Sequence, residues 1–118
     1  MVRELKKETK QNAMGGEGSI EFQHILTKEE MLGHGRLLAR VVIHPHSSIG
    51  WHTHVGETEP YFILEGEGVF VDNDGSRTPV KAGDVCVIEV GQSHSLENPT
   101  DNDLVIIACV LYGPGMDK

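Results

Sequence analysis

The stretch that decides the fold is WHTHVGETEPYFILEGEG, residues 51–68. It begins with two histidines, His52 and His54, that are separated by one residue, and it continues into an apolar run that ends at glycine. Side chains two residues apart in a β-strand point to the same face, with their Cα atoms about 6.5 to 7 Å apart. The stretch therefore predicts a β-strand whose two imidazoles, from His52 and His54, point at a common position.

The chain around this stretch is typical of an all-β protein. From position 36 onward, short runs rich in Val, Ile, Leu, Phe and Tyr are separated by Gly, Pro, Asn and Asp. Thr27 and Glu30 match a capping box, which predicts a single helical turn that ends by Gly33. Many short strands in a small chain favour a sandwich or a closed barrel. The predicted strands are 19–26, 36–44, 49–54, 59–65, 68–72, 77–80, 85–90, 94–97 and 103–112, with turns at 45–48, 55–58, 72–76, 81–84 and 98–102.

Length and composition limit the functions open to the chain. Its 118 residues suit a single domain, 1–118, and the polar residues 1–17 are expected to form an N-terminal arm. A net charge of −8 opposes binding to nucleic acid or to anionic membranes. Neither an apolar run of about 20 residues nor a signal peptide is present, so a cytoplasmic location is expected. Cys86 and Cys109 lie in apolar runs and are predicted to be buried thiols.

The carboxylate Glu59 follows His54 by five residues, and a turn between them is expected to return it to the histidines. The strand that starts at Glu59 places Tyr61 on the same face. Phe62 and Leu64 then point outward, where they are expected to pack against other strands.

Two further residues bear on a metal site. Glu57 competes with Glu59 as the carboxylate ligand, and Glu59 is favoured. His94 follows a turn and begins a separate strand, so spacing alone does not connect it to the pair. Three neutral imidazoles and one carboxylate suit one divalent transition metal ion, namely Mn, Fe, Co, Ni, Cu or Zn, better than Mg or Ca. The candidate metal ligands are His52, His54, Glu59 and His94.

Two segments resemble the motifs of the cupin superfamily. Residues 51–68 are similar to the first motif, His-x-His-x4-Glu-x6-Gly, and 83–98 are similar to the second, Gly-x5-Pro-x-Gly-x2-His-x3-Asn. The chain departs from the family where His46 stands in place of an initial Gly and Glu89 in place of Pro. The matching positions are His52, His54, Glu59, Gly66, Gly83, Gly91, His94 and Asn98.

The cupin resemblance implies a double-stranded β-helix, a jelly-roll-like barrel with a metal ion inside it. Two coordination positions would remain open at the mouth for water or substrate. The resemblance also implies a homodimer, in which the subunits could exchange N-terminal strands.

Within the cupins, the chain is most similar to small single-domain proteins described as resembling oxalate decarboxylases. The leading hypothesis is a metal-dependent enzyme, a decarboxylase or dioxygenase, that acts on a small oxygen-rich acid. A non-catalytic module that binds a metal or a small ligand is the alternative, and a sugar or sugar-phosphate isomerase ranks third. Those decarboxylases carry arginine three residues before the first histidine ligand, whereas this chain has Ile49. Oxalate decarboxylation is therefore not assigned.

Two residues are candidates for catalytic roles. Tyr61 could donate a proton or a hydrogen bond near the metal, although a phenol on a barrel wall often only packs. Arg40 interrupts an apolar run and could hold a substrate carboxylate inside the barrel, although an outward salt bridge is favoured. His44 and His46 form a second pair with one intervening residue, but Pro45 between them favours the surface. His24 and His34 are also expected at the surface.

Overall fold

The computed structural model describes residues 1–115, which form two antiparallel sheets. Among these residues, no helix has the length and apolar character needed to span a bilayer. The helical elements are two short 3-10 turns, η1 (Ala13–Gly15) and η2 (Glu29–Met31). The larger sheet has the order β1 (Lys7–Gln11), β2 (Ser19–Leu26), β3 (Gly35–Ile43), β11 (Leu104–Tyr112), β6 (Tyr61–Glu65) and β9 (Val85–Cys86), and β5 (Glu57–Thr58) also pairs with β11. The smaller sheet has the order β4 (Ser48–Thr53), β10 (Ser93–Glu97), β7 (Glu67–Val71) and β8 (Arg77–Lys81).

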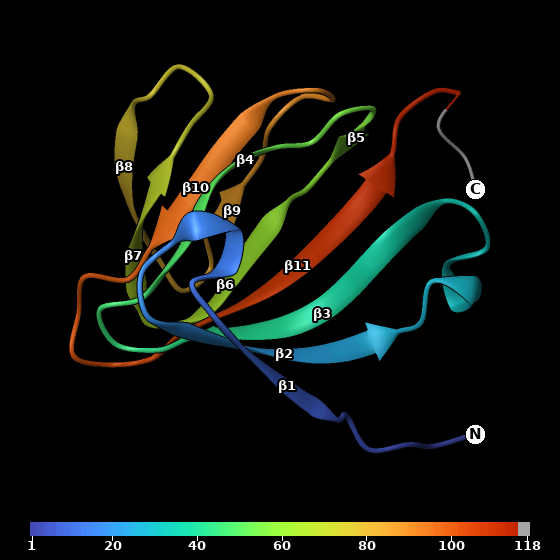
Figure 1. Ribbon diagram of the computed structural model, residues 1–118, viewed down its shortest axis with the longest axis horizontal. Helices are drawn as coiled ribbons and strands as arrows, with labels where there is room; N and C mark the ends of the chain where they lie inside the picture. Colours follow the sequence, from blue (N-terminus) through green and yellow to red (C-terminus); the bar gives the residue numbers. More distant parts are fainter. Residues whose placement is uncertain (116–118) are drawn as a thin grey trace.

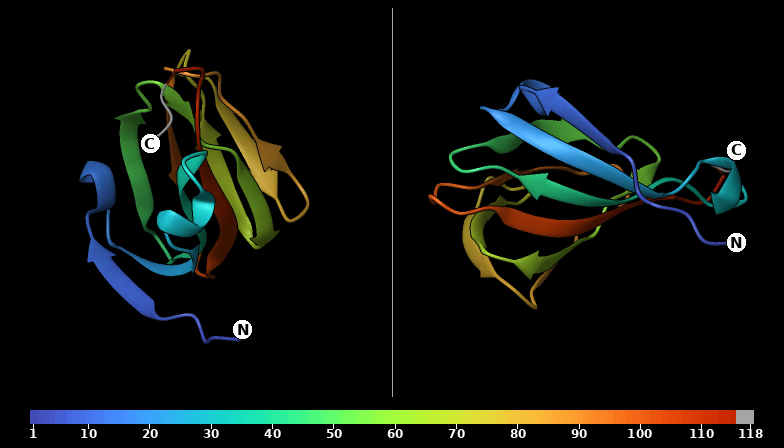
Figure 2. Two further views of the ribbon diagram at one scale, coloured as in Figure 1. Left: turned by 90° about the vertical axis from the view of Figure 1, so that its right-hand side faces the viewer. Right: turned by 90° about the horizontal axis from the view of Figure 1, so that it is seen from below.

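The two sheets face each other and enclose the apolar core (Figures 1 and 2). Strands β3 and β11 supply much of this core because alternate residues of each strand point inward. Ala39, Val41 and Ile43 of β3 are fully buried, as are Leu104 and Ile106 of β11. The predicted all-β, double-stranded β-helix architecture is confirmed.

Two residues of the cupin-like motifs hold the corners where the chain passes from one sheet to the other. Gly66 joins β6 to β7 with a φ of 86°, and a Cβ atom there would overlap the carbonyl oxygen of Asp103. The buried Asn98 donates from its side-chain amide to the carbonyl oxygens of Ile43 (2.9 Å), His44 (3.1 Å) and Asn102 (2.7 Å). Both corners therefore depend on a residue type that others cannot replace without strain or a lost hydrogen bond.

The N-terminal arm has more structure than its polar composition predicts. Strand β1 pairs with β2 of the same chain, although its side chains are exposed. The turn η1 then lies against β4 (Figure 1). This contact requires glycine, because a Cβ atom on Gly16 or Gly50 would overlap the backbone of the other segment. No apolar periodicity marks these elements, so backbone pairing and close packing decide them.

Several local predictions need correction. The strand predicted at 85–90 pairs only over Val85–Cys86. The capping box is confirmed, with Thr27 N–H donating to Glu30 Oε1 at 2.9 Å and Glu30 N–H donating to Thr27 Oγ1 at 3.2 Å, but η1 makes a second helical turn.

Three side chains are also less buried than predicted. Phe62 and Leu64 point outward as expected, yet they are 41% and 38% exposed and are not covered by other strands. Cys86 is buried, whereas Cys109 is only partly buried. Phe62, Leu64 and Cys109 lie on the outer face of the larger sheet, which nothing in residues 1–115 fully covers.

Candidate metal centre

Four side chains from three parts of the chain converge between the sheets. His52 lies in β4 and His54 just beyond the end of that strand, while Glu59 lies between β5 and β6. His94 of β10 is paired with His52 in the antiparallel register. One nitrogen or oxygen atom from each of the four residues lies within 4.8 Å of those of the others. The structure thus brings together all four predicted ligands.

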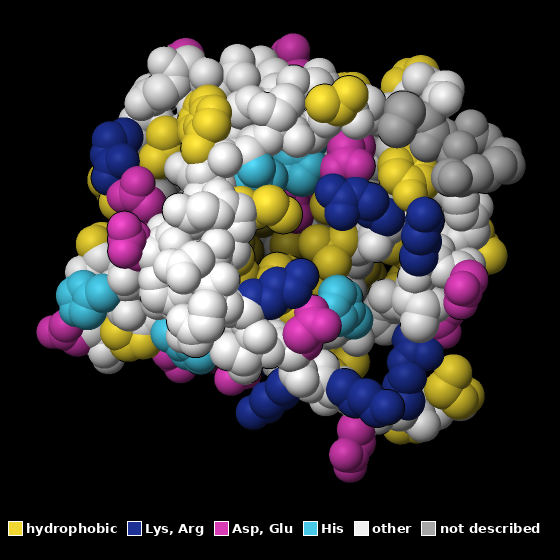
Figure 3. Space-filling view, viewed as in Figure 1, with side chains coloured by type: hydrophobic (Ala, Val, Ile, Leu, Met, Phe, Trp, Pro, Cys, Tyr) yellow, Lys and Arg dark blue, Asp and Glu magenta, His cyan; other side chains and the backbone are white. Residues whose placement is uncertain are grey.

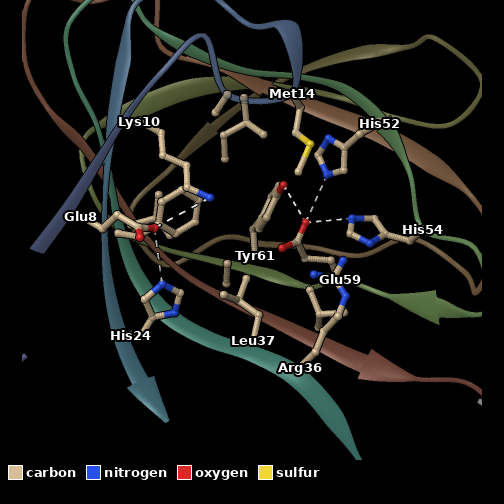
Figure 4. A pocket seen from close by; sticks show the side chains of 16 residues that line it. Glu8, Lys10, Met14, His24, Arg36, Leu37, His52, His54, Glu59 and Tyr61 are labelled. Atoms are coloured by element: carbon tan, nitrogen blue, oxygen red, sulfur yellow. Dashed lines mark hydrogen bonds and ion pairs between the residues drawn. The ribbon is translucent and has the colours of Figure 1, made fainter. Parts of the chain in front are cut away.

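The carboxylate oxygen Oε1 of Glu59 lies at the middle of this cluster (Figure 4). It is 2.9 Å from His54 Nε2, 3.2 Å from His94 Nε2 and 3.3 Å from His52 Nε2. Nitrogen and oxygen ligands bonded to a metal at about 2.0 to 2.2 Å lie roughly 3.0 to 3.4 Å apart when they are neighbours. The spacing of the four ligand atoms therefore fits a transition metal ion.

The other ring nitrogens decide which tautomer two of the histidines adopt. His52 Nδ1 is 2.7 Å from the carbonyl oxygen of Gly50, and His54 Nδ1 is 2.6 Å from Glu57 Oε2. Both partners are acceptors, so each Nδ1 carries the proton and each neutral ring points a lone pair of Nε2 at Glu59. Lone pairs facing a carboxylate repel one another unless a cation lies between them, and this arrangement therefore fits a metal centre.

Glu57 lies behind His54, outside the group of four residues that could hold a metal ion. Its carboxylate accepts two hydrogen bonds from Arg36, at 2.8 Å from Nε and 2.7 Å from Nη2, in addition to the bond from His54. Burial opposes ionisation of Glu57, but the bonds from Arg36 and His54 lower its pKa overall. A carboxylate kept charged in this way fixes the orientation of the His54 ring. No sequence signal identified Arg36, which is distant from Glu57 in the chain.

Burial and hydrogen bonding compete at the ligands themselves. Burial disfavours the charged form of Glu59, yet the ring nitrogens of His52, His54 and His94, at 2.9 to 3.3 Å from Glu59 Oε1, hold its pKa well below the usual value. Burial also acts against protonation of His54, but Glu59 and Glu57 raise its pKa. For His94, burial dominates and the pKa is lowered. The cluster therefore contains an ionised carboxylate and one imidazole, His94, whose lowered pKa disfavours its protonation.

His94 is held by packing rather than by a hydrogen bond behind the ring. It is fully buried, and its Nδ1 has no hydrogen-bond partner among the residues that the structure describes. Its ring stacks on Tyr61, with centroids 4.8 Å apart, and meets the edge of Phe70 at 5.7 Å. Tyr61 donates its hydroxyl to Glu59 Oε1 at 3.0 Å. Burial and the Glu59 charge raise the Tyr61 pKa well above its usual value, so Tyr61 stays protonated.

Comparison with known proteins supports this reading of the cluster. The sequence model of the family described as "Cupin domain" matches residues 39–110, which include all four predicted ligands. The chain belongs to the cupin family. A protein of Thermotoga maritima named "Oxalate-binding protein" is 48% identical over 108 residues, covering 92% of this chain and 88% of that protein.

Solved structures agree with this assignment. The crystal structure of a "predicted oxalate decarboxylase" from Thermotoga maritima is 47% identical, with a TM-score of 0.90, covering 95% of this chain and 98% of that one. A Cupin 2 conserved barrel domain protein from Salinispora arenicola is 26% identical, with a TM-score of 0.74, covering 98% of this chain and 91% of that one. The cupin barrel thus extends over nearly the whole chain.

The cluster of His52, His54, Glu59 and His94 lies at one wall of a cavity of about 320 Å³. Figure 3 shows this cavity as a hollow with apolar walls, and charged and histidine side chains lie around it. His52, His54, Glu59 and Tyr61 line the cavity on one side, while Lys10 and other residues of β1 and β2 line the opposite side (Figure 4). The cluster is therefore reachable by a small molecule.

The structure places Arg40 outside the barrel, as the favoured of the two sequence interpretations had it, and thereby rules out the candidate role as an interior cation. Its strand neighbours Ala39 and Val41 point into the core, so the alternation of β3 directs Arg40 to the outer face. There it donates to Gln23 Oε1 of β2 at 2.7 Å, and it does not line the cavity. Arg36, four residues earlier, is the arginine that reaches the cavity.

The two departures from the cupin motifs have local explanations. His46 has a φ of 58°, a left-handed conformation that glycine adopts more readily than other residues, which accounts for the glycine in the family motif. The Glu89 N–H donates to Gln92 Oε1 at 2.8 Å, a bond that the family's proline could not make. Neither departure touches the metal cluster.

Proposed function

We propose that this cupin binds one divalent transition metal ion through His52, His54, Glu59 and His94, and that it binds a small carboxylate beside the metal. The observation that carries the proposal is the convergence of the imidazole nitrogens on Glu59 Oε1 at 2.9 to 3.3 Å, at the wall of an accessible cavity. A mixed nitrogen and oxygen set is suited to Mn, Fe, Co, Ni, Cu or Zn. When bound, the metal would supply the positive charge that attracts a carboxylate.

One observation supports a carboxylate as the ligand: the 48% identical relative is named for binding oxalate. The protein itself offers few free cations for such an anion, because the cavity has the apolar Ile49 where the similar decarboxylases carry arginine. Arg36 is already paired with Glu57 in two hydrogen bonds. The charge of a bound carboxylate would therefore be balanced mainly at the metal cluster.

The metal can be tested by elemental analysis of protein purified without added metal. We expect close to one transition metal ion per chain, and substitution of Glu59 by Gln to remove most of it. Glu65→Gln is the matched control, because Glu65 is exposed and lies at the end of β6, the strand that follows Glu59. Full metal content in the Glu59→Gln protein would overturn the proposed ligand set.

The carboxylate can be tested by calorimetric titration of oxalate into the metal-loaded and metal-free proteins. We expect saturable binding of one oxalate per metal, and no binding without the metal. Equal binding to both forms would show that the anion is not held at the metal. Absence of binding to the loaded form would overturn the carboxylate proposal.

Catalysis on such an acid, by decarboxylation or dioxygenation, is a second candidate. It is favoured by one observation: the Tyr61 hydroxyl lies 3.0 Å from Glu59 Oε1 and 3.3 Å from His94 Nε2, inside the cluster. Mn- or Fe-loaded protein incubated with dicarboxylates, keto acids and diols should then consume at least one of them. No turnover at full metal occupancy would leave binding as the function. Isomerisation of sugar phosphates remains third, because the cavity offers few free cations for a phosphate.

We also propose that the cupin is a homodimer. The support is the edge position of β1, whose side chains are all exposed, because an unpaired strand edge favours pairing with another chain. Light scattering coupled to size-exclusion chromatography should give twice the mass of the chain. A single-chain mass would refute the dimer.

A further inference from the structure

The cavity extends well beyond the metal cluster. From the cluster it reaches Phe22 of β2 and the β1 residues Glu8 and Lys10 on the opposite side (Figure 4). Its volume of about 320 Å³ lies within the range of about 300 to 1,000 Å³ that is typical of sites for larger organic ligands. Oxalate has only six non-hydrogen atoms, so most of the cavity would be left for other contents.

Water is a poor candidate for that remaining space. A buried water needs two to four polar partners, but the walls beyond the cluster are largely aliphatic. Leu37 and Val41 of β3, Ile49 of β4 and Val110 of β11 line the cavity, and their side chains offer neither donors nor acceptors. Apolar ligand atoms would release water from these walls and gain from their own burial.

The far end of the cavity does not call for a second anionic group. Lys10 lies 3.8 Å from Glu8 and 5.2 Å from the ring centre of Phe22. The His24 ring stacks on the same Phe22 ring, with centroids 5.9 Å apart. Glu8 is also 3.9 Å from His24. The single positive charge of Lys10 is thus matched by a carboxylate. An aromatic ring, Phe22, is the main contact that this end offers to a ligand.

From these observations we infer that the natural ligand is a 2-hydroxy or 2-oxo acid with a branched or aromatic apolar body, rather than oxalate itself. This inference rests on the proposed function, because the acid group must lie at the metal cluster. Such an acid shares with oxalate two oxygen atoms on adjacent carbon atoms. Its body would extend along Leu37 and Ile49 toward Phe22.

A homologous series of ligands tests the inference directly. Calorimetric titrations of the metal-loaded protein would compare oxalate, glycolate, lactate, 2-hydroxy-4-methylpentanoate and 3-phenyllactate. Each buried methylene group is expected to tighten binding by about fourfold. Because burial in the open cavity is incomplete, we expect 2-hydroxy-4-methylpentanoate and 3-phenyllactate to bind at least about tenfold more tightly than glycolate.

A pair of variants locates the apolar contact. Leu37→Asn replaces a cavity wall with a polar side chain of similar size, and Leu38→Asn changes the neighbouring residue, which does not line the cavity. We expect Leu37→Asn to weaken binding of 3-phenyllactate by about fivefold or more, with glycolate binding changed less than about twofold. Leu38→Asn should change neither. Should Leu37→Asn fail to fold, Met14→Asn at the exposed turn η1, which also lines the cavity, makes the same comparison.

The outcomes separate this inference from the proposed function. Binding of glycolate or oxalate with no increase along the series would overturn the apolar ligand while leaving the metal-dependent carboxylate site intact. A rise in affinity that persists unchanged in both cavity variants would also overturn it, because the body would then bind elsewhere. Failure of every acid, including oxalate, to bind the loaded protein would overturn the proposed function itself.

Discussion

This cupin contains two His-x-His pairs, and the structure gives them opposite surroundings. The ring centroids of His52 and His54 lie 4.7 Å apart, and both rings point at the carboxylate of Glu59 in the interior. His44 and His46 follow the end of β3, where His44 bonds Ser19 Oγ at 2.8 Å and the exposed His46 lies 2.6 Å from Asp101. Identical spacing thus produces a convergent pair in one place and a divergent pair in the other.

The difference lies in the backbone and in the partners behind the rings. His52 lies in an extended strand, whereas His46 has a φ of 58° in a turn that follows Pro45. A strand keeps alternate side chains on one face, and a turn does not. A buried carboxylate, Glu57, then orients His54, while the acidic partner of His46 is almost fully exposed. Convergence needs both the strand and the buried partner.

The largest difference in metal binding is expected between variants that lack one or the other histidine pair. The double variant His52→Ala/His54→Ala is expected to lower metal affinity more than about 100-fold, because it removes two of four ligands. The double variant His44→Ala/His46→Ala should retain the metal content of the wild type. Elemental analysis after dialysis measures both. Equal metal loss in the two variants would show that the divergent pair also contributes ligands.

The carboxylates behind the rings sharpen the comparison. Glu57→Gln is expected to weaken metal binding by about 10- to 100-fold, because loss of a partner behind a ligand histidine has effects of this size. Asp101→Asn, which changes the exposed partner of His46, should leave metal affinity unchanged. Competition with a chelator gives both affinities. An unchanged affinity in Glu57→Gln would mean that packing alone orients His54.

The pH dependence of metal binding should follow the convergent pair. In the metal-free protein, burial lowers the pKa of His54. The opposing effect of Glu59 and Glu57 is larger, so the net pKa of His54 is above the usual value. Protonated His54 then contributes stability at low pH that is lost as the pH rises through the raised pKa. Metal requires the deprotonated ring, so its stabilisation is greatest above that pKa and declines on acidification.

Thermal unfolding with and without metal measures this effect between about pH 5 and about pH 8. We expect the increase in Tm caused by the metal to shrink steadily toward the acidic end. The His44→Ala/His46→Ala protein should show the same profile as the wild type. An increase in Tm that is constant with pH would contradict binding through neutral imidazoles.

The smallest effect is expected from Tyr61→Phe. This change removes the hydrogen bond to Glu59 but keeps the ring that stacks on His94. We expect a loss of about 1 kcal/mol in the free energy of unfolding and metal content near that of the wild type. Urea denaturation and elemental analysis check both values. Loss of the metal would instead place the Tyr61 hydroxyl among the groups that build the site.

The strands and the four clustered residues were predictable because the signals for them are local. Alternation along β3 and β11 marks inward positions, and the resemblance to the two cupin motifs marks His52, His54, Glu59 and His94. Asn98 and Gly66 were predictable as motif positions, although the corners that they hold became visible only in the structure. Local patterns left both orientations of Arg40 open, because an apolar run does not show which face of the strand the residue occupies.

The amino-acid sequence by itself therefore determined the all-β fold and the residues that could hold a metal, because periodicity and spacing act along the chain. Only the tertiary structure decided that Arg36 and Glu57 orient His54, that β1 and η1 border the cavity, and that aliphatic side chains line much of it. These features join residues that are far apart in the chain. Their contacts depend on how two sheets pack, which no local pattern encodes.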